Sequence, residues 1–435
     1  MRSRSLVVMF GFVGALLAAG YGVLFTLLDD FRDTYGISES ALGAVIGIGF
    51  LAGFVAQIAL APLADRGHAR MLVLSGMVLN IVGVVLLAVS STVVPMLGGR
   101  FVMGLGAGMA VPAIRRIVIL ADPAHLGQNL GRILAADVAG FATGPAVAAI
   151  FSPIGLRAPF IFIAAVTALT IPFVARTSVV ETAAPASQRL AFDLLRQRRF
   201  AAAVALGCGL WLMIGAFDAL WSVVLDDLHT AEWIATLGIS LFALPIVIFG
   251  GIGGRLAQRV GPFRLGTVGL LLAAVFMASY GLVPSGAAMF GVAMVHAVSD
   301  GLTASSTGVA VGMVVPPERQ AGAQGVLGGI ATLVAGITAI GVGVLYDHAG
   351  RTTSYLVVAA AMVVVVALGA FLAGGDVVLR PRRTDVPQVV DGVVHQVTGE
   401  GVDGELGAVA PGAAAFPLVP GDGTERLGHR AAGGH

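Results

Sequence analysis

Three acids and one histidine lie inside long apolar runs of this sequence, where an ionised side chain is costly. The acids are Asp137, Asp218 and Asp300, and His296 comes four residues before Asp300, on the same face of a helix. A buried carboxyl group and an imidazole can both exchange protons near neutral pH. Counted from the ends of their runs, Asp218 and His296 lie at similar depth, so we predict that Asp218, His296 and Asp300 form a proton-responsive cluster. A histidine that only packs between helices is the alternative for His296.

One cation, Arg100, also lies inside an apolar run. An arginine at the centre of a membrane helix costs at least about 2.5–3.5 kcal/mol, so it should face a polar interior or a partner. We predict that Arg100 takes part in proton coupling by exchanging a carboxylate or water partner. A structural arginine bonded to backbone carbonyl groups is the alternative interpretation.

Two short polar knots stand between long apolar runs. The first, LAPLADRGHAR at 60–70, carries Asp65, Arg66 and Arg70, and the second, GRLAQRVGPFR at 254–264, repeats its pattern. Gln258 stands in the second knot where Asp65 stands in the first. Two such knots between membrane-length runs indicate a duplicated membrane protein.

Composition supports a membrane location. Hydrophobic residues make up 57% of the chain and charged residues 11%, whereas soluble domains carry about 25% charged residues. The sequence contains arginine but no lysine, which excludes a phosphate-loop lysine and a Schiff-base lysine. The formal net charge of +1 argues against nucleic acid as a partner, and the single Cys208 cannot form an intrachain disulfide. No metal-ligand cluster, cofactor motif or nucleophile–base pair stands out, so we do not predict an enzyme.

The apolar runs are long enough to cross a bilayer, which requires about 20 residues. Connections are short except after the sixth run, where residues 176–199 predict a linker. Residues 1–175 and 200–375 are then two predicted domains of six runs each, and residues 376–435 are a predicted disordered tail. The twelve runs fall near 6–28, 41–61, 71–90, 93–119, 129–151, 157–175, 200–225, 233–252, 264–284, 287–314, 321–345 and 353–374.

The two domains repeat each other. The first run ends in LLDDF at 27–31, the seventh ends in VLDDL at 224–228, and a knot follows both the second and the eighth run. A parallel repeat of six helices predicts a pseudo-twofold axis along the membrane normal and a cavity between the halves. We therefore predict an all-α membrane protein with twelve transmembrane helices in two six-helix bundles around a central cavity.

Arginine placement predicts the orientation, because cytoplasmic loops carry an excess of basic residues. With the N-terminus inside, the outside loops hold only Arg32, Arg157 and Arg351 and are otherwise acidic. We therefore predict a multi-pass protein of the inner (plasma) membrane, with the linker and both termini in the cytoplasm.

Several motifs resemble those of the major facilitator superfamily over residues 1 to about 375. The first knot is similar to the superfamily's loop motif between its second and third helices. RFVMGLG at 100–106 is similar to the R-x-x-x-G-x-G motif of its fourth helix. GFATGPAVAA at 140–149 resembles the G-x-x-x-G-P-x-x-G-G motif of proton-coupled antiporters, with Gly140, Gly144 and Pro145 in place and alanine at the last two glycine positions.

The resemblance implies secondary transport by alternating access. Proton-coupled efflux of a small organic molecule by a monomer in the lipid bilayer is the function that we expect. The resemblance also implies a cytoplasmic gate formed by Asp65, Arg66 and Arg70, in which Asp65 meets a helix N-terminus of the other half. Two other functions stay open: proton symport or uniport of a metabolite, and a membrane sensor or assembly subunit that transports nothing.

The repeat also suggests where a substrate would bind. It places Tyr21 of the first run at the position that Asp218 occupies in the seventh. We predict that Tyr21, Phe25 and Trp211 line the substrate cavity as aromatic side chains. A lipid-facing or interfacial position of these aromatic residues is the alternative.

Overall fold

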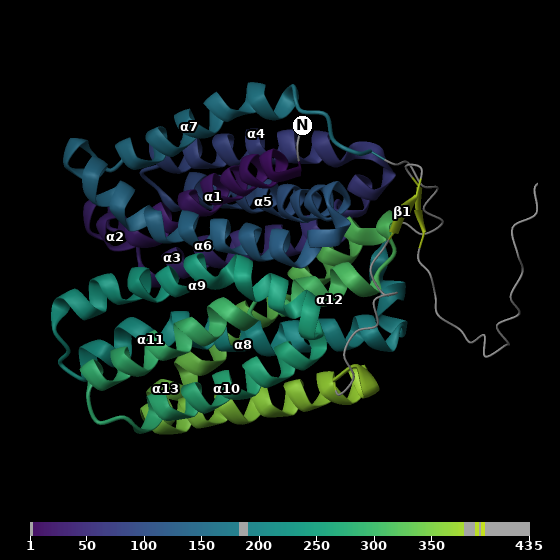
Figure 1. Ribbon diagram of the computed structural model, residues 1–435. Helices are drawn as coiled ribbons and strands as arrows, with labels where there is room; N and C mark the ends of the chain where they lie inside the picture. Colours follow the sequence, from purple (N-terminus) through teal and green to yellow (C-terminus); the bar gives the residue numbers. More distant parts are fainter. Residues whose placement is uncertain (1–2, 182–189, 378–387, 391–392, 396–435) are drawn as a thin grey trace, which may run out of the picture. The chain divides into compact units, whose positions relative to one another are not determined.

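Each predicted apolar run forms a helix in the computed structural model, which describes residues 3–181, 190–377, 388–390 and 393–395 (Figure 1). Most helices end within a few residues of the predicted limits. The eighth run continues to Val260, because its last two turns are amphipathic and extend the helix beyond the apolar part. The helices are α1 (Ser3–Thr26), α2 (Leu28–Tyr35), α3 (Glu39–Ala59), α4 (Ala69–Val89), α5 (Val93–Ala121), α6 (Leu126–Phe151), α7 (Ala158–Ala175), α8 (Arg198–Asp227), α9 (Glu232–Val260), α10 (Pro262–Leu282), α11 (Gly286–Thr303), α12 (Ser306–Val314) and α13 (Gln320–Ala373).

One predicted run is interrupted, and two others are joined. The tenth run is divided into α11 and α12 at Ala304 and Ser305. The eleventh and twelfth runs form the single element α13, which reverses at Gly350, where φ is 73°. That left-handed conformation favours glycine. Eleven helical stretches are long and apolar enough to cross a membrane, and the last contains two predicted spans, so twelve crossings are consistent with the described helices.

The helices pack in two groups, α1–α7 and α8–α13, which Figure 1 shows on opposite sides. α1 packs on α6 and α5 packs on α3 and α4 in the first half, whereas α13 packs on α8 and α10 in the second. The halves meet where α6 contacts α9 and where α3 contacts α13. We call the end that carries the two knots the Arg-rich end, and the end that carries Asp226 and Asp227 the acidic end.

Short elements connect and follow the helices. The knot contains a π-helical turn, Ala64–His68, and the linker contains a 3₁₀ helix, Ala191–Arg196, whereas residues 182–189 lie outside the described part. The predicted disordered tail falls mostly on residues 378–387, 391–392 and 396–435, which also lie outside it. Two short strands in that region, β1 (Gln388–Val390) and β2 (Val393–His395), pair antiparallel and were not expected. The prediction of an all-α membrane-spanning chain is otherwise confirmed.

Candidate functional site

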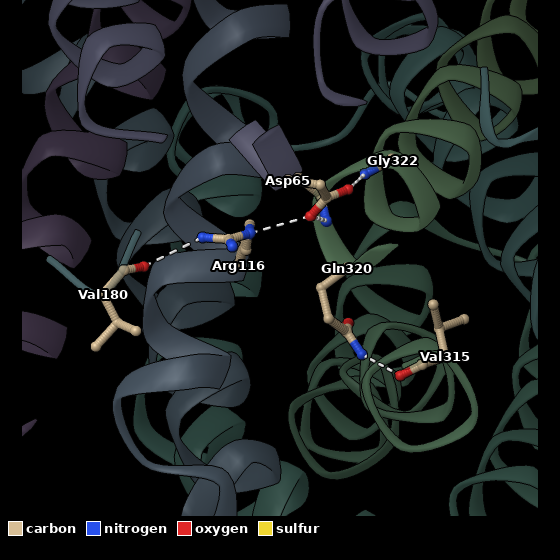
Figure 2. A network of polar contacts seen from close by, with 7 residues as sticks. Asp65, Arg116, Val180, Val315, Gln320 and Gly322 are labelled. Atoms are coloured by element: carbon tan, nitrogen blue, oxygen red, sulfur yellow. Dashed lines mark hydrogen bonds and ion pairs between the residues drawn. The ribbon is translucent and has the colours of Figure 1, made fainter. Parts of the chain in front are cut away.

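Asp65 joins the two halves at the Arg-rich end. The neighbouring Gly67 has a φ of 86°, which favours glycine, and Asp65 itself is buried. Oδ1 of Asp65 accepts hydrogen bonds from the Ala321 N–H at 2.9 Å and from Arg116 Nε at 3.0 Å, and Oδ2 accepts one from the Gly322 N–H at 2.8 Å (Figure 2). The carboxylate therefore binds the N-terminus of α13 and a buried guanidinium, both of which stabilise its negative charge.

The arginine that meets Asp65 comes from a distant part of the sequence. Arg116, on α5, is fully buried, and its Nη1 also donates to the Val180 carbonyl oxygen at 3.3 Å. Arg70 is exposed and donates instead to two backbone carbonyl groups at the end of α7, at 3.1 and 3.4 Å. Arg66 is half-buried on the π-helical turn. The predicted gate contained the arginines nearest to Asp65 in sequence and did not include Arg116. The pair of charges at 115–116 inside an apolar run does indicate a buried cation that needs a partner.

The second knot makes a similar contact in the opposite direction. Gln258 Oε1 accepts a hydrogen bond from the Gly127 N–H at 2.9 Å, and Gln258 Nε2 donates to the Ala124 carbonyl oxygen at 3.1 Å. Gly127 lies in the first turn of α6. Each half therefore holds a helix N-terminus of the other, once through a carboxylate and once through a neutral amide. The charge-assisted contact of Asp65 is the stronger of the two.

The linker fixes the segment that precedes α13. Asp193 accepts two hydrogen bonds from the Arg319 guanidinium, at 2.5 and 2.6 Å. These bonds hold the pKa of the Asp193 carboxyl below its ordinary value, because they stabilise the ionised form. Arg319 directly precedes α13, so the linker positions the chain whose N–H groups bind Asp65.

α3 and α13 pack closely near the Arg-rich end. A Cβ atom at Gly325 would lie 2.7 Å from the Ala61 Cβ, and one at Gly329 would lie 3.4 Å from Phe54 Cδ2. These distances leave no passage between the two helices at this end.

The same faces separate towards the acidic end. Gly47 and Gly43 lie on the face of α3 that carries Phe54, and Gly336 and Gly343 lie on the corresponding face of α13. Among the residues that the structure describes, no neighbouring atom lies within 4 Å of a Cβ placed at any of these four glycines. The structure is thus closed between α3 and α13 at the Arg-rich end and open at the acidic end.

The antiporter-type motif lies in the packing of α6 on α1. A Cβ at Gly140 would lie 2.5 Å from Ala15 Cα, and Gly144 contacts the Gly22 backbone as closely. Pro145 is inside α6. The structure therefore brings these three motif residues to a helix contact within the first half, and not to the contact between the halves.

Two other pairs of glycines make the contact of α6 with α9. The backbone of Gly127 lies against Gly254, and that of Gly131 lies against Gly250. Small residues let two helix backbones approach closely. The helices cross here with backbone against backbone.

Arg100 is fully buried on α5 among aromatic rings and glycine. Its Cζ lies 4.2 Å from the ring centroid of Tyr21 and 5.4 Å from that of Phe50. A Cβ at Gly49 would lie 2.5 Å from the same carbon, so only glycine leaves room for the guanidinium. None of the three guanidinium nitrogens has a hydrogen-bond partner among the described residues.

The predicted cluster of three titratable groups is a buried pair and a separate carboxyl. His296 Nε2 lies 3.5 Å from Asp300 Oδ2, and His296 Nδ1 shares a 2.8 Å hydrogen bond with the Tyr280 hydroxyl. Asp218 is exposed, and within the described ranges no ion pair or hydrogen bond joins it to this pair. Equal depth did not bring the groups together, because α8 packs mainly on α13, whereas α11 packs on α9 and α10.

The predicted aromatic residues fall in two places. Tyr21 covers Arg100, and Phe25 meets Phe141 edge to face with ring centroids 6.0 Å apart. Trp211 is partly buried against the apolar core of the second half. Phe50 and Phe141, which sequence analysis did not single out, complete the aromatic surroundings of Tyr21 and Phe25.

Known proteins resemble this chain in sequence and in fold. A sequence model of the Major Facilitator Superfamily matches residues 10–226 and 208–420. The quinolone resistance protein NorA of Staphylococcus aureus is 24% identical over 218 residues, which cover 49% of this chain and 56% of that protein. The chain thus spans about half the length of the curated relatives it matches.

Solved structures with the same fold cover most of the chain. The human organic anion transporter MFSD10 (TETRAN) has a TM-score of 0.70 at 17% identity and covers 85% of this chain and 100% of its own. The fucose:proton symporter FucP of E. coli has a TM-score of 0.67 at 16% identity and covers 86% of this chain and 100% of its own. The proton:xylose symporter XylE has a TM-score of 0.70 at 13% identity and covers 85% of this chain and 95% of its own. The predicted fold of two six-helix bundles is therefore confirmed, and the family match over both halves shows that this multi-pass membrane chain belongs to the Major Facilitator Superfamily of transporters.

Proposed function

We propose that the chain is a proton-coupled exporter of small organic molecules in the plasma membrane, with its Arg-rich end and both termini in the cytoplasm. The observation that carries the proposal is the closed network around Asp65 at one end, combined with separated helix faces at the other. In the proposed orientation, this state faces outward. Release of substrate to the outside and uptake of a proton would occur from it.

Asp218 is the proposed site of proton binding. It lies inside a membrane helix, is exposed, and has no ion-pair partner among the described residues, so proton loading would not require breaking a salt bridge. His296 and Asp300 are proposed to respond as a buried pair, because the imidazole Nε2 faces the Asp300 carboxyl at 3.5 Å while Nδ1 is occupied by the Tyr280 hydroxyl. Arg100 stays a predicted participant in proton coupling.

The proposed gate is the pair of Asp65 and Arg116. The linker supports it through the contact of Val180 with Arg116 and that of Asp193 with Arg319. Arg70 and Arg66 belong to the same turn and are proposed to position it. Closing this gate neutralises two buried charges at once, whereas opening it exposes both to cytoplasmic water. That exchange makes the closed and open states comparable in free energy, as a cycling transporter requires.

Export is favoured over import by two observations. GFATGPAVAA at 140–149 resembles an antiporter motif, and the name of NorA, a relative at 24% identity, records quinolone resistance. The solved structures of FucP and XylE are named as proton symporters, so symport of a metabolite is the second candidate. A sensor that transports nothing is the third.

Transport in liposomes separates the three candidates. The full chain would be reconstituted with a pH-sensitive dye inside and a fluorescent quinolone outside or inside, under a pH gradient of either sign. Export by exchange predicts that quinolone and protons move in opposite directions and that a protonophore abolishes quinolone accumulation. Movement in the same direction would favour symport, and no gradient-dependent movement across a panel of organic substrates would favour the sensor.

A further inference from the structure

Arg100 carries a buried charge that no carboxylate among the described residues neutralises. The guanidinium has no exposed surface, and none of its nitrogens has a hydrogen-bond partner among the described residues. The aromatic ring of Tyr21 lies against it, with 4.2 Å between Arg100 Cζ and the ring centroid. A charged side chain held in this way is costly, so its position requires an explanation.

Two acids of the first half already interact with other arginines. Asp65 is paired with Arg116 at 3.0 Å, and Asp137 interacts electrostatically with Arg115. No salt bridge reaches Arg100 from any carboxylate in the part of the chain that the structure describes. Arg100 therefore has no carboxylate as a counter-charge in the described part of the chain.

The open side of the structure leads to Arg100. Gly43, Gly47 and Phe50 recur at four and three residues, so they share the face of α3 that looks towards the separated part of α13. Gly43 and Gly47 have open space before them, and the half-exposed Phe50 is the ring that covers Arg100 on this face. The Tyr21 and Phe50 rings lie over the guanidinium, so an anion that enters between α3 and α13 has to displace aromatic side chains to reach it.

We propose that Arg100 binds the carboxylate of a transported organic anion, with Tyr21 and Phe50 against the aromatic or apolar body of the same molecule. The guanidinium offers paired N–H donors that match a carboxylate, and the flanking rings match a flat apolar skeleton. Gly49 is then required because any side chain there would occupy the position of the guanidinium. The inference rests on the proposed transport function and adds the chemical class of its substrate: small organic acids with an aromatic body.

Equilibrium binding to the purified full chain tests the proposal without any gradient. The probes are 1-naphthoate and its methyl ester, which share the aromatic body and differ in the carboxylate. Wild type should bind naphthoate about tenfold or more tightly than the ester, because only the carboxylate of naphthoate can accept charge-assisted hydrogen bonds from the Arg100 guanidinium. Arg100→Gln should reduce that preference to about twofold or less, and Arg100→Lys should keep part of it, because a lysine retains the charge without the paired donors. Arg157→Gln, a change of an exposed arginine at the acidic end, is the matched control and should keep the full preference.

The outcomes separate this inference from the transport proposal. Equal affinity of wild type for the two probes, including binding of neither, would overturn it, as would a preference that Arg100→Gln retains. A circular dichroism spectrum and thermal unfolding of each variant show that it is folded, and Arg100→Lys gives a second reading if the glutamine variant is not. Naphthoate binding that depends on Arg100 without proton-driven flux in liposomes would sink the transport proposal alone, whereas flux of neutral compounds with no carboxylate preference would sink this one alone.

Discussion

Asp65 and Gly322 are 257 residues apart in the chain, yet the Gly322 N–H donates a 2.8 Å hydrogen bond to the Asp65 carboxylate. The bond joins a turn of the first half to the first turn of a helix in the second. It can exist only while the Arg-rich end is closed, so in an alternating-access cycle it must break and form once per turnover.

Removing the charge of Asp65 should open the Arg-rich end. In Asp65→Asn, Arg116 is left as a buried cation without a carboxylate, a change that costs about 3–5 kcal/mol when one partner of a buried pair is lost. We expect a transport rate at least about tenfold lower, because this cost exceeds the roughly 1.4 kcal/mol that corresponds to a factor of ten. A reporter cysteine in place of Gln57, whose side chain lies against Gly328 of α13 at the closed end, should react faster with a water-soluble maleimide in a Cys208→Ser background. Asp33→Asn, a change of an exposed acid at the acidic end, is the control and should alter neither measurement. Unchanged labelling in Asp65→Asn would contradict the gate.

A disulfide across the closed end should stop the cycle. The double variant Ala61→Cys with Gly325→Cys places two cysteines across this contact. A Cβ at position 325 would lie 2.7 Å from that of residue 61, so a small backbone shift brings the two to the Cβ–Cβ distance of about 3.8 Å that a disulfide requires. Oxidation should abolish transport and reduction should restore it. Gly47→Cys with Gly336→Cys, at the open end, is the matched pair and should remain reduced under the same oxidant in the outward-facing state. Rapid crosslinking of the second pair but not the first would mean that the closed end has been misassigned.

Asp218→Asn should separate substrate binding from proton coupling. The amide keeps the size of the side chain but cannot take up a proton, so counterflow of substrate should continue while accumulation driven by a pH gradient is lost. The expected loss is at least about tenfold, typical of removing a group that transfers a proton. Asp226→Asn, an exposed acid of the same helix, should behave as wild type. If Asp218→Asn and Asp300→Asn both retain gradient-driven accumulation, neither carboxyl carries the coupled proton.

The linker ion pair should make stability sensitive to acid. Because the folded-state pKa of Asp193 lies below its ordinary value of about 3.9, its stabilisation is present above that value and is lost as pH falls through the lowered pKa. Asp193→Asn should therefore lower the free energy of unfolding at pH 7 by roughly 1 kcal/mol and leave stability at the lowest pH unchanged. Thermal unfolding of both proteins across that range measures the difference. Asp376→Asn removes the more exposed Arg199–Asp376 pair and should have a smaller effect. A constant difference between wild type and Asp193→Asn at every pH would show that the carboxyl charge is not the cause.

A methyl group at Gly140 should destabilise the first half. Its Cβ would lie 2.5 Å from Ala15 Cα, so α1 and α6 must separate, and overpacking of this kind costs about 1–3 kcal/mol. Gly98→Ala is the matched control, since nothing lies within 4 Å of a Cβ there, and alanine should stabilise that helix by up to about 1 kcal/mol. Thermal unfolding in one detergent compares the two variants. Equal stability of the two would mean that the α1–α6 contact yields without cost.

The helices were predictable because membrane-length apolar runs and arginine-bearing connections are local features of the sequence. The equivalent places of Asp65 and Gln258 were predictable from the repeat. Two adjacent arginines inside an apolar run mark Arg116 as a cation that needs a partner, but which partner it meets depends on which face of α5 is buried. Asp218 was grouped with His296 by depth, and depth says nothing about rotation around the helix axis or about which neighbours each helix packs against.

The crossing of α6 and α9 has a kinetic consequence. Where Gly127 and Gly131 meet Gly254 and Gly250, these four residues bring no side chain of their own to the contact. Two interdigitated helices must lift side chains out of grooves and through unfavourable rotamers before they can rotate, which raises the activation barrier. Two bare backbones can roll past one another with a nearly constant number of van der Waals contacts. The energy barrier to rotation of α6 against α9 should therefore be low at this contact. The hydrogen bonds of Asp65 and Gln258 then determine how long the protein stays in each state.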